Sequence, residues 1–365
     1  MKELHATTAV IQGGDDEWYD RSITDYKELM MLEMENVPLL LSVGGPDNLF
    51  ILERKDERRQ VLSNFQLPDT IIESRQNEVV KSSHMKINAG AFITYDLKQI
   101  NSLYGQKCAL ASGVNLSGLS VYRMSTDSDR IVKDCERLFE GSLMEPRFCQ
   151  VDETTQILSK TVDDPVYSCD MGSDSIKQLN LSKSSPDRGS NLIPFAVSNR
   201  SLALGSENSG NVVIYDFPTE GPVMTLLGHA AGAKYRIASS YKAIPGHPSS
   251  TIIASTSEHG SVAVYDLRAP NRPLSTGKAT VESANKICVS PDEKYISISD
   301  KTGKVRIYSY SPEGICEKFV HEGHVRMEHC NTSAECIDHV WYSQSTLISC
   351  ATNKSINIWQ PNLRA

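Results

Sequence analysis

The sequence lacks any long apolar stretch. No segment of its 365 residues approaches the ~20 apolar residues that a membrane-spanning helix needs, so we expect no membrane association. The amino-terminal residues 1–20 also lack the apolar core of a secretory signal and turn acidic at Asp15, so nothing directs secretion. Its 9 cysteines are an odd number and scattered, which fits free thiols in a reducing compartment. We therefore expect a cytoplasmic protein.

Basic residues are the minority among the charged ones. The chain has 37 lysines and arginines against 45 aspartates and glutamates, and its net charge is −8. No long basic run offsets this balance, which argues against nucleic-acid binding driven by phosphate neutralisation. We therefore expect no direct nucleic-acid partner. The negative charge favours a protein partner with a basic surface, because complementary fields speed encounter.

Sequence motifs that carry catalysis are absent as well. The chain contains no phosphate-binding Gly-x-x-x-x-Gly-Lys and no dinucleotide-binding Gly-x-Gly-x-x-Gly. It also has neither the Gly-x-Ser-x-Gly elbow of serine hydrolases nor the His-Glu-x-x-His of zinc proteases. We therefore predict a protein that is not an enzyme, has no catalytic residues and needs no cofactor.

One short pattern recurs seven times along the chain. In each copy a small or turn residue is followed by alternating apolar positions, which is the two-residue period of a strand. The copies end at Leu52, Tyr122, Leu179, Tyr215, Tyr265, Tyr308 and Trp359. Their spacing averages about 50 residues, longer than the ~40–45 residues of a WD-type propeller blade, so enlarged loops are expected. The apolar ends of the copies are predicted to lie in the core.

A second apolar segment precedes most copies and is joined to its copy by a tight turn. The clearest turns end in Gly210, Gly260 and Gly303, where glycine supplies the positive φ that a tight hairpin needs. Strand pairs repeated in this way indicate antiparallel sheets. We predict an all-β fold, a seven-bladed WD40-type β-propeller with a short N-terminal helical appendage.

The copies are degenerate as WD repeats. Gly-His pairs at residues 228–229 and 323–324 stand where such a repeat places them, but no copy ends in Trp-Asp. The third copy, which ends at Leu179, is the weakest. In the loop after the second copy, an apolar stripe over residues 130–139 predicts a short helix.

The last copy stands too close to residue 365 for another strand to follow it. An unpaired sheet edge there would be a liability. We expect a strand near the N-terminus to fill this position and close the ring, with residues 3–11 and 22–29 as the two candidates. Residues 1–28 are thus predicted to form the appendage and the ring-closing strand, and residues 29–365 the propeller. The segment at residues 14–19 resembles a capped helix start with acidic residues in its first turn.

Several segments resemble, in the same order along the chain, the WD repeat-containing protein 73 family. The opening Gly14-Asp15-Asp16-Glu17-Trp18 is similar to the opening of that family. The other similar segments are residues 95–98, 127–133, 254–268, 273–275, 321–324, 339–341, 347–353 and 356–359. Agreement is poor over residues 140–195, and the last blade lacks the Trp-Asp pair.

The resemblance implies a function that composition and spacing do not reveal. It implies a scaffold or assembly factor for the Integrator complex, which processes small nuclear RNA (snRNA), through endonuclease subunits 9 and 11. It also implies microtubule-associated partners, and presence at spindle poles and partly in the nucleus as well as in the cytoplasm. A cytoskeletal adaptor at microtubules and a substrate receptor of a ubiquitin ligase are the alternative functions.

Asp15, Asp16, Glu17 and Trp18 form the candidate partner-binding segment. They lie outside the repeats, so the blades do not require them. Tryptophan is favoured at binding hot spots, and the neighbouring carboxylates would orient it on a basic surface. The alternative is that Trp18 packs against the propeller and belongs to its core.

Histidines and cysteines of the types that bind zinc gather near the end of the chain. They are His321, His324, His329, Cys330, Cys336 and His339. Cys336 and His339 have a workable ligand spacing. However, His324 belongs to a Gly-His pair, whose histidine is expected to hydrogen-bond within its blade, and His339 directly precedes strand residues. We therefore predict no metal site.

Overall fold

The computed structural model describes residues 23–363 apart from several connecting segments. The longest of these segments are residues 67–85, 139–146, 180–191, 242–249 and 327–333. The described residues form strands and their connections and contain no α-helix; two short 3₁₀ turns, η1 (Ile23–Asp25) and η2 (Gly323–Arg326), accompany the strands. The predicted all-β class is therefore confirmed for this part of the chain.

The described strands form antiparallel sheets of four strands each. The first sheet contains β2 (Val37–Val43), β3 (Asn48–Arg54), β4 (Gln60–Gln66) and β5 (Lys86–Ile93). The second contains β6 (Leu97–Leu103), β7 (Cys108–Gly113), β8 (Gly118–Met124) and β9 (Ile131–Leu138). The third contains β10 (Arg147–Gln150), β11 (Thr155–Ser159), β12 (Val166–Asp170) and β13 (Ser175–Gln178).

The second half of the chain repeats this arrangement. The fourth sheet contains β14 (Leu192–Ala196), β15 (Ser201–Ser206), β16 (Val212–Asp216) and β17 (Gly221–Leu226). The fifth contains β18 (Tyr235–Ser239), β19 (Ile252–Ser257), β20 (Ser261–Asp266) and β21 (Ser275–Lys278). The sixth contains β22 (Ala284–Val289), β23 (Tyr295–Asp300), β24 (Val305–Ser311) and β25 (Gly314–His321). The last contains β26 (Cys336–Trp341), β27 (Leu347–Ala351), β28 (Ser355–Pro361) and β1 (Tyr26–Glu33).

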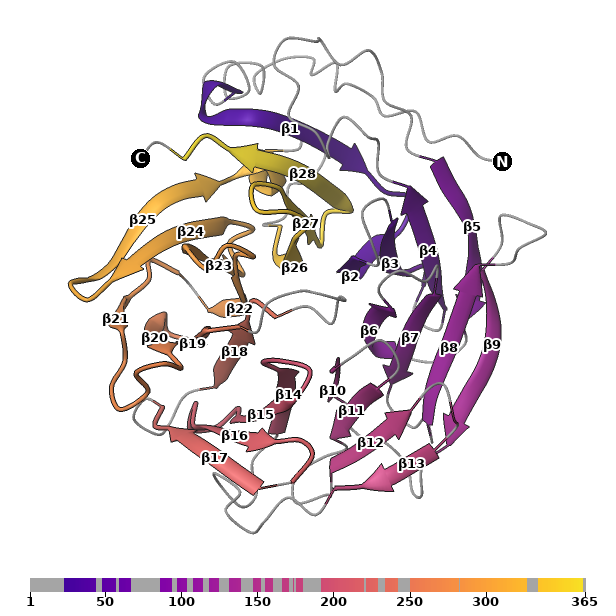
Figure 1. Ribbon diagram of the computed structural model, residues 1–365. Coiled ribbons are helices and arrows are strands. Elements are labelled where there is room, and N and C mark those ends of the chain that lie inside the picture. The colour runs from indigo at the N-terminus through magenta and orange to yellow at the C-terminus, as the bar shows by residue number, and fades with distance from the viewer. Residues whose placement is uncertain are drawn as a thin grey trace.

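The sheets follow one another around a common centre (Figure 1). Their innermost strands contact each other in succession, in the order β2, β6, β10, β14, β18, β22 and β26. Strand β26 in turn contacts β2, so the contacts between inner strands run around the whole circle. A ring of four-stranded antiparallel sheets is compatible with a β-propeller.

The N-terminal strand β1 (Tyr26–Glu33) completes the last sheet. It pairs antiparallel with β28, with Leu29 opposite Trp359 and Met30 opposite Ile358. This strand overlaps the candidate segment 22–29 and continues to Glu33, so the boundary predicted after residue 28 falls inside it. The other candidate, residues 3–11, and the helix start at residues 14–19 lie outside the described residues.

The predicted glycine turns are confirmed. Gly210, Gly260 and Gly303 have φ values of 69°, 82° and 79°, and each lies between the second and third strands of its sheet. In the last sheet the same turn places Lys354 at φ 67°. A side chain is unfavourable in this left-handed region, so this turn carries strain that the other three avoid.

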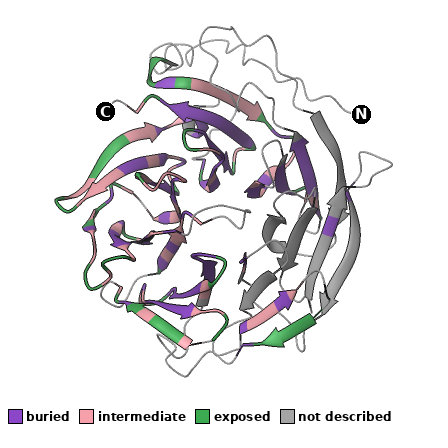
Figure 2. Ribbon diagram, in the orientation of Figure 1, coloured by how far each residue is buried: buried purple, intermediate pink, exposed green. Residues whose placement is uncertain are grey.

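The residues that end the seven copies are all buried, as predicted. Five of them belong to apolar clusters between neighbouring sheets, namely Leu179, Tyr215, Tyr265, Tyr308 and Trp359. One such cluster joins Val262 and Val264 of the fifth sheet to Ile296 and Ile298 of the sixth. In Figure 2 the exposed residues gather instead on outer strands such as β13 and β17. The core is therefore the set of interfaces between sheets rather than one central cluster.

One expectation about an individual segment is wrong. Of the stripe predicted as a helix over residues 130–139, residues 131–138 form strand β9, which pairs with β8, because a sheet edge supplies hydrogen bonds that an isolated short helix lacks.

The seven copies do not all occupy the same position in their sheets. The first copy, ending at Leu52, is the second strand of its sheet, whereas the third copy, ending at Leu179, covers the outermost strand β13. The other copies occupy the third strand. Alternation marks a strand but does not reveal its position in a sheet.

Candidate functional site

The candidate partner-binding residues Asp15, Asp16, Glu17 and Trp18 lie outside the described residues. The described part of the chain starts at Ile23, where η1 leads directly into β1. Strand β1 in turn pairs with β28 of the last sheet, and the side chains at this junction anchor it to the ring.

Tyr26, the first residue of β1, anchors the strand through its buried side chain. Its hydroxyl lies 2.9 Å from Nδ1 of His321. Its ring packs edge-on against Phe319 and Trp359, with centroid distances of 5.0 Å and 6.3 Å. Burial raises the pKa of the Tyr26 hydroxyl well above its usual range. Tyr26 thus ties the N-terminal strand to both the sixth and the last sheet.

His321 forms the centre of this junction. Its ring stacks on Trp359 with a centroid distance of 4.4 Å and an interplanar angle of 8°. Its Nε2 atom lies 3.0 Å from Nδ2 of Asn357, so both ring nitrogens have partners. Burial, together with the neighbouring His324, lowers the pKa of His321 well below its ordinary value. The imidazole is therefore neutral at physiological pH.

His324 is engaged in a second buried network. Its Nε2 atom lies 2.7 Å from Oγ of Ser349, and its Nδ1 atom lies 2.6 Å from Oγ of Ser355. Trp359 donates from Nε1 to the same Ser349 hydroxyl at 3.1 Å, and Ser355 donates to Oδ1 of Asn353 at 2.5 Å. Burial lowers the pKa of His324 to about 3. The prediction that this histidine hydrogen-bonds within its blade is confirmed.

His339, on β26 of the last sheet, is hydrogen-bonded to the sixth sheet. Its Nε2 atom lies 2.9 Å from Oγ of Ser297 on β23, which also accepts a 2.9 Å hydrogen bond from Nε1 of Trp341. Burial and the positive charge of Lys286 lower the pKa of His339 to about 3. His329 and Cys330 lie outside the described residues. Within the part of the chain that the structure covers, no three His, Cys, Asp or Glu side chains are grouped as metal ligands would be.

Ion pairs link successive sheets. Lys286 on β22 lies 2.5 Å from Oδ1 of Asp338 on β26. The other oxygen of Asp338 accepts a 2.8 Å hydrogen bond from the backbone N–H of Leu41 on β2. One carboxylate therefore connects the sixth, last and first sheets. Similarly, Arg236 on β18 pairs with Glu207, which follows β15, at 2.5 Å.

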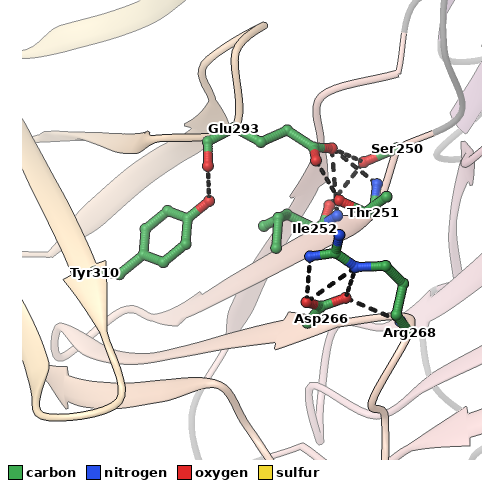
Figure 3. A network of polar contacts seen from close by, with 7 residues as sticks. All are labelled: Ser250, Thr251, Ile252, Asp266, Arg268, Glu293 and Tyr310. Atoms are coloured by element: carbon green, nitrogen blue, oxygen red, sulfur yellow. Dashed lines mark hydrogen bonds and ion pairs between the residues drawn. The ribbon is translucent and has the colours of Figure 1, made fainter.

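The carboxylate of Glu293 also joins the fifth and sixth sheets through a set of hydrogen bonds, which we call the Glu293 clasp (Figure 3). Glu293, in the turn between β22 and β23, accepts hydrogen bonds from the Ser240 hydroxyl at 2.6 Å and the Ser250 hydroxyl at 3.0 Å. It also accepts from the backbone N–H of Thr251 at 2.8 Å and from the Thr251 hydroxyl. Tyr310 donates from its hydroxyl to the backbone carbonyl of Glu293.

The clasp holds Glu293 in a backbone conformation with φ 55°, which is unfavourable for a residue with a side chain. Burial opposes the negative charge of the carboxylate, but the hydrogen bonds from Ser240 and Thr251 outweigh it and lower the pKa of Glu293. Nearby, Arg268 binds Asp266 through two nitrogens, at 2.9 Å and 2.6 Å. Sequence reasoning missed this clasp, because its donors come from a different repeat.

A pocket of about 350 Å³ lies between the fifth and sixth sheets, on the opposite side from this clasp. Three cations line it: Lys278, Lys304 and Arg306. Lys304 pairs with Glu322 at 2.6 Å, and Arg306 with Asp300 at 2.5 Å. These pairs compensate most of the positive charge, so the pocket is a weak site for an anion.

No protein-family model matches the chain, and the curated proteins contain no match to it. None of the helical turns in the described residues is long and apolar enough to cross a membrane. The buried histidines and carboxylates described above bind other parts of the same chain. Their arrangement holds neighbouring sheets in fixed positions.

Proposed function

We propose that the protein is a non-enzymatic interaction scaffold built on a seven-bladed WD40-type β-propeller with an N-terminal appendage. The observation that supports this proposal is the closed order of contacts between inner strands, with β1 in the last sheet. A ring held by buried polar contacts keeps its loops in fixed positions. Such a frame suits the binding of partner proteins, because binding residues concentrate on loops that a rigid scaffold positions.

The proposed partner is the RNA endonuclease of the Integrator complex, through its subunits 9 and 11. The protein would assist assembly of this enzyme for snRNA processing and would act mainly in the cytoplasm. Support for this partner comes from the resemblance of the sequence to the WD repeat-containing protein 73 family. The acidic segment Asp15–Glu17 with Trp18 is the proposed docking element, and β1 anchors it to the ring.

Affinity purification of the full chain followed by mass spectrometry tests this function. The proposal requires the endonuclease subunits to dominate the recovered proteins. Recovery dominated by tubulin-associated proteins would replace it with the cytoskeletal adaptor, and cullin adaptors would replace it with the ubiquitin-ligase receptor. The matched control is a chain with Asp15 and Asp16 changed to lysine, which should recover less of the endonuclease.

A further inference from the structure

The outer strand of the fourth sheet differs from the other outer strands. Each sheet ends in one outer strand, namely β1, β5, β9, β13, β17, β21 and β25. Strand β17 has the sequence Gly-Pro-Val-Met-Thr-Leu and carries no charge. Every other outer strand contains at least one lysine, arginine, aspartate or glutamate. Charges on an edge strand deter pairing with another chain, so β17 is the edge without this protection.

Side chains of β17 alternate between a covered and an exposed face. Leu226 is buried, and Met224 packs against the same apolar cluster. Val223 and Thr225 point the other way, and Leu227 continues their alternation one residue beyond the strand. Val223 is 64% exposed and Leu227 is 72% exposed. The strand and the residue after it therefore present a short uncharged row of Val223, Thr225 and Leu227 to solvent.

The exposed side chain of Leu227 stands on a backbone that hydrogen bonds hold in place. Its carbonyl oxygen accepts a hydrogen bond from the Tyr265 hydroxyl of the next sheet. The following N–H, of Gly228, donates to Oδ1 of Asn211 at 2.7 Å. A Cβ on Gly228 would lie only 2.3 Å from the backbone carbon of Gly210, so the chain packs closely there. A leucine displayed by a fixed backbone is ready to bind without first being ordered.

We propose that the outer edge of β17 binds an extended, uncharged segment of a partner protein, which adds to the sheet as a further strand. This inference rests on the proposed scaffold function and names the kind of partner that one of its surfaces takes. Main-chain hydrogen bonds along the edge would supply affinity, and contacts with Val223 and Leu227 would supply specificity. The segment would carry apolar side chains at alternate positions, to match the exposed row.

Edge length favours a peptide segment over a second copy of this chain. Six residues of strand extend for only about 20 Å, so an edge of this length buries much less than the ~800 Å² per partner that stable association of two folded copies needs. Pro222 has no N–H to donate, and the pairing of β17 with β16 is irregular next to it, between Ile214 and Tyr215. Pairing is therefore confined to the part of the edge from Val223 onward.

The test uses the purified full-length chain and a phage-displayed library of random peptides. Selected peptides are expected to be uncharged and alternately apolar, and their synthetic forms should bind the wild-type chain. Leu227→Lys should weaken that binding at least ~10-fold. The matched control is Ile176→Lys, which changes an exposed apolar residue on β13 and should leave the affinity unchanged. N-methylation of alternate peptide amides should abolish binding, because it removes the main-chain donors.

Several outcomes would overturn the inference. A selection that yields no peptide whose binding depends on Leu227 means that no such surface exists. Binding that withstands N-methylation means an apolar patch rather than strand addition. Concentration-dependent dimerisation that Leu227→Lys abolishes means that a second copy occupies the edge. If Leu227→Lys lowers the melting temperature of the protein, Thr225→Lys replaces it in the binding measurements, because Thr225 belongs to the same exposed row. Purified components make these results independent of whether the endonuclease is recovered from cells.

Discussion

Single carboxylates and hydroxyls hold neighbouring sheets of this ring together. Glu293 is the clearest case, because one side chain receives hydrogen bonds from Ser240, Ser250 and Thr251 of another sheet. A non-glycine residue in the left-handed region costs about 1–3 kcal/mol and persists where surrounding contacts impose it. The contacts of the carboxylate therefore stabilise the turn against its own backbone strain.

We predict that Glu293→Ala lowers the free energy of unfolding by about 2–4 kcal/mol, because several donors lose a charged acceptor. Glu293→Gly should lower the free energy of unfolding by less than Glu293→Ala does, since glycine tolerates the φ of 55°. Chemical denaturation of the purified variants measures both values. The control is Glu335→Ala, at an exposed residue next to the last sheet, which should change the free energy of unfolding little. Equal stability of Glu293→Ala and the wild type would show that the clasp contributes nothing.

At Lys354 a substitution is expected to stabilise the protein rather than destabilise it. It stands in the left-handed region, at φ 67°, in the turn where three other sheets use glycine. Lys354→Gly should raise the free energy of unfolding by about 0.5–1 kcal/mol, because the strain relieved exceeds the entropy that glycine adds to the unfolded chain. Thermal and chemical denaturation measure the change. A less stable variant would mean that the lysine side chain makes a contact that outweighs its backbone strain.

Trp18 decides whether the acidic segment docks a partner. If it is the anchor, Trp18→Ala should weaken binding to the endonuclease subunits by about 2 kcal/mol, roughly thirtyfold, with an unchanged melting temperature. If it packs on the ring instead, the same variant should melt at a lower temperature. Pull-down and melting are measured on one purified preparation. Unchanged binding by a well-folded variant would exclude the docking role.

At the scale of whole elements, β1 is the strand that completes the last sheet. It pairs with β28 along its length and is anchored through Tyr26 to His321. Without β1, strand β28 would become an unpaired edge rich in apolar residues. Such an edge is a template for aggregation.

Deleting residues 1–28 should therefore yield an unstable and aggregating protein, because it removes Tyr26 and the first part of β1. Deleting residues 1–22 is the matched control, since it leaves β1 intact from Tyr26 onward. Light scattering and thermal melting compare the two truncated chains. A chain lacking residues 1–28 that melts like the full-length protein would refute the role of β1.

At the scale of the whole molecule, the buried histidines make stability depend on pH. The pKa values of His324 and His339 are lowered to about 3 in the folded state, and that of His321 is also lowered. In the unfolded chain these residues titrate near the ordinary histidine value of ~6.5. Between these values the unfolded state binds more protons, so acidification favours unfolding.

We expect the free energy of unfolding to be insensitive to these histidines above about pH 6.5 and to fall below it. Each histidine contributes a slope of up to about 1.4 kcal/mol per pH unit, and the loss ends near the folded-state pKa. Denaturation at a series of pH values measures the slope. His324→Gln should reduce the slope by the share of one histidine, whatever its effect on stability at neutral pH. A profile that stays flat on acidification to about pH 5 would contradict the neutral burial of these rings.

The sequence by itself determined the features that depend on near neighbours in the chain. Alternating apolar residues reveal strands through their period of two, and glycines reveal tight turns through the φ that only they adopt freely. The turns at Gly210, Gly260 and Gly303, and the burial of residues such as Tyr308 and Trp359, were predictable for this reason.

Tertiary structure alone decided which strand edges meet and which polar groups face one another. Residues 131–138 became a strand because β8 offered an edge, and the first and third copies stand at other positions in their sheets than the remaining copies do. The partners of the Glu293 carboxylate and of the His339 ring come from other repeats, more than 40 residues away along the chain. No local pattern encodes such contacts, because they exist only once the ring brings successive sheets side by side.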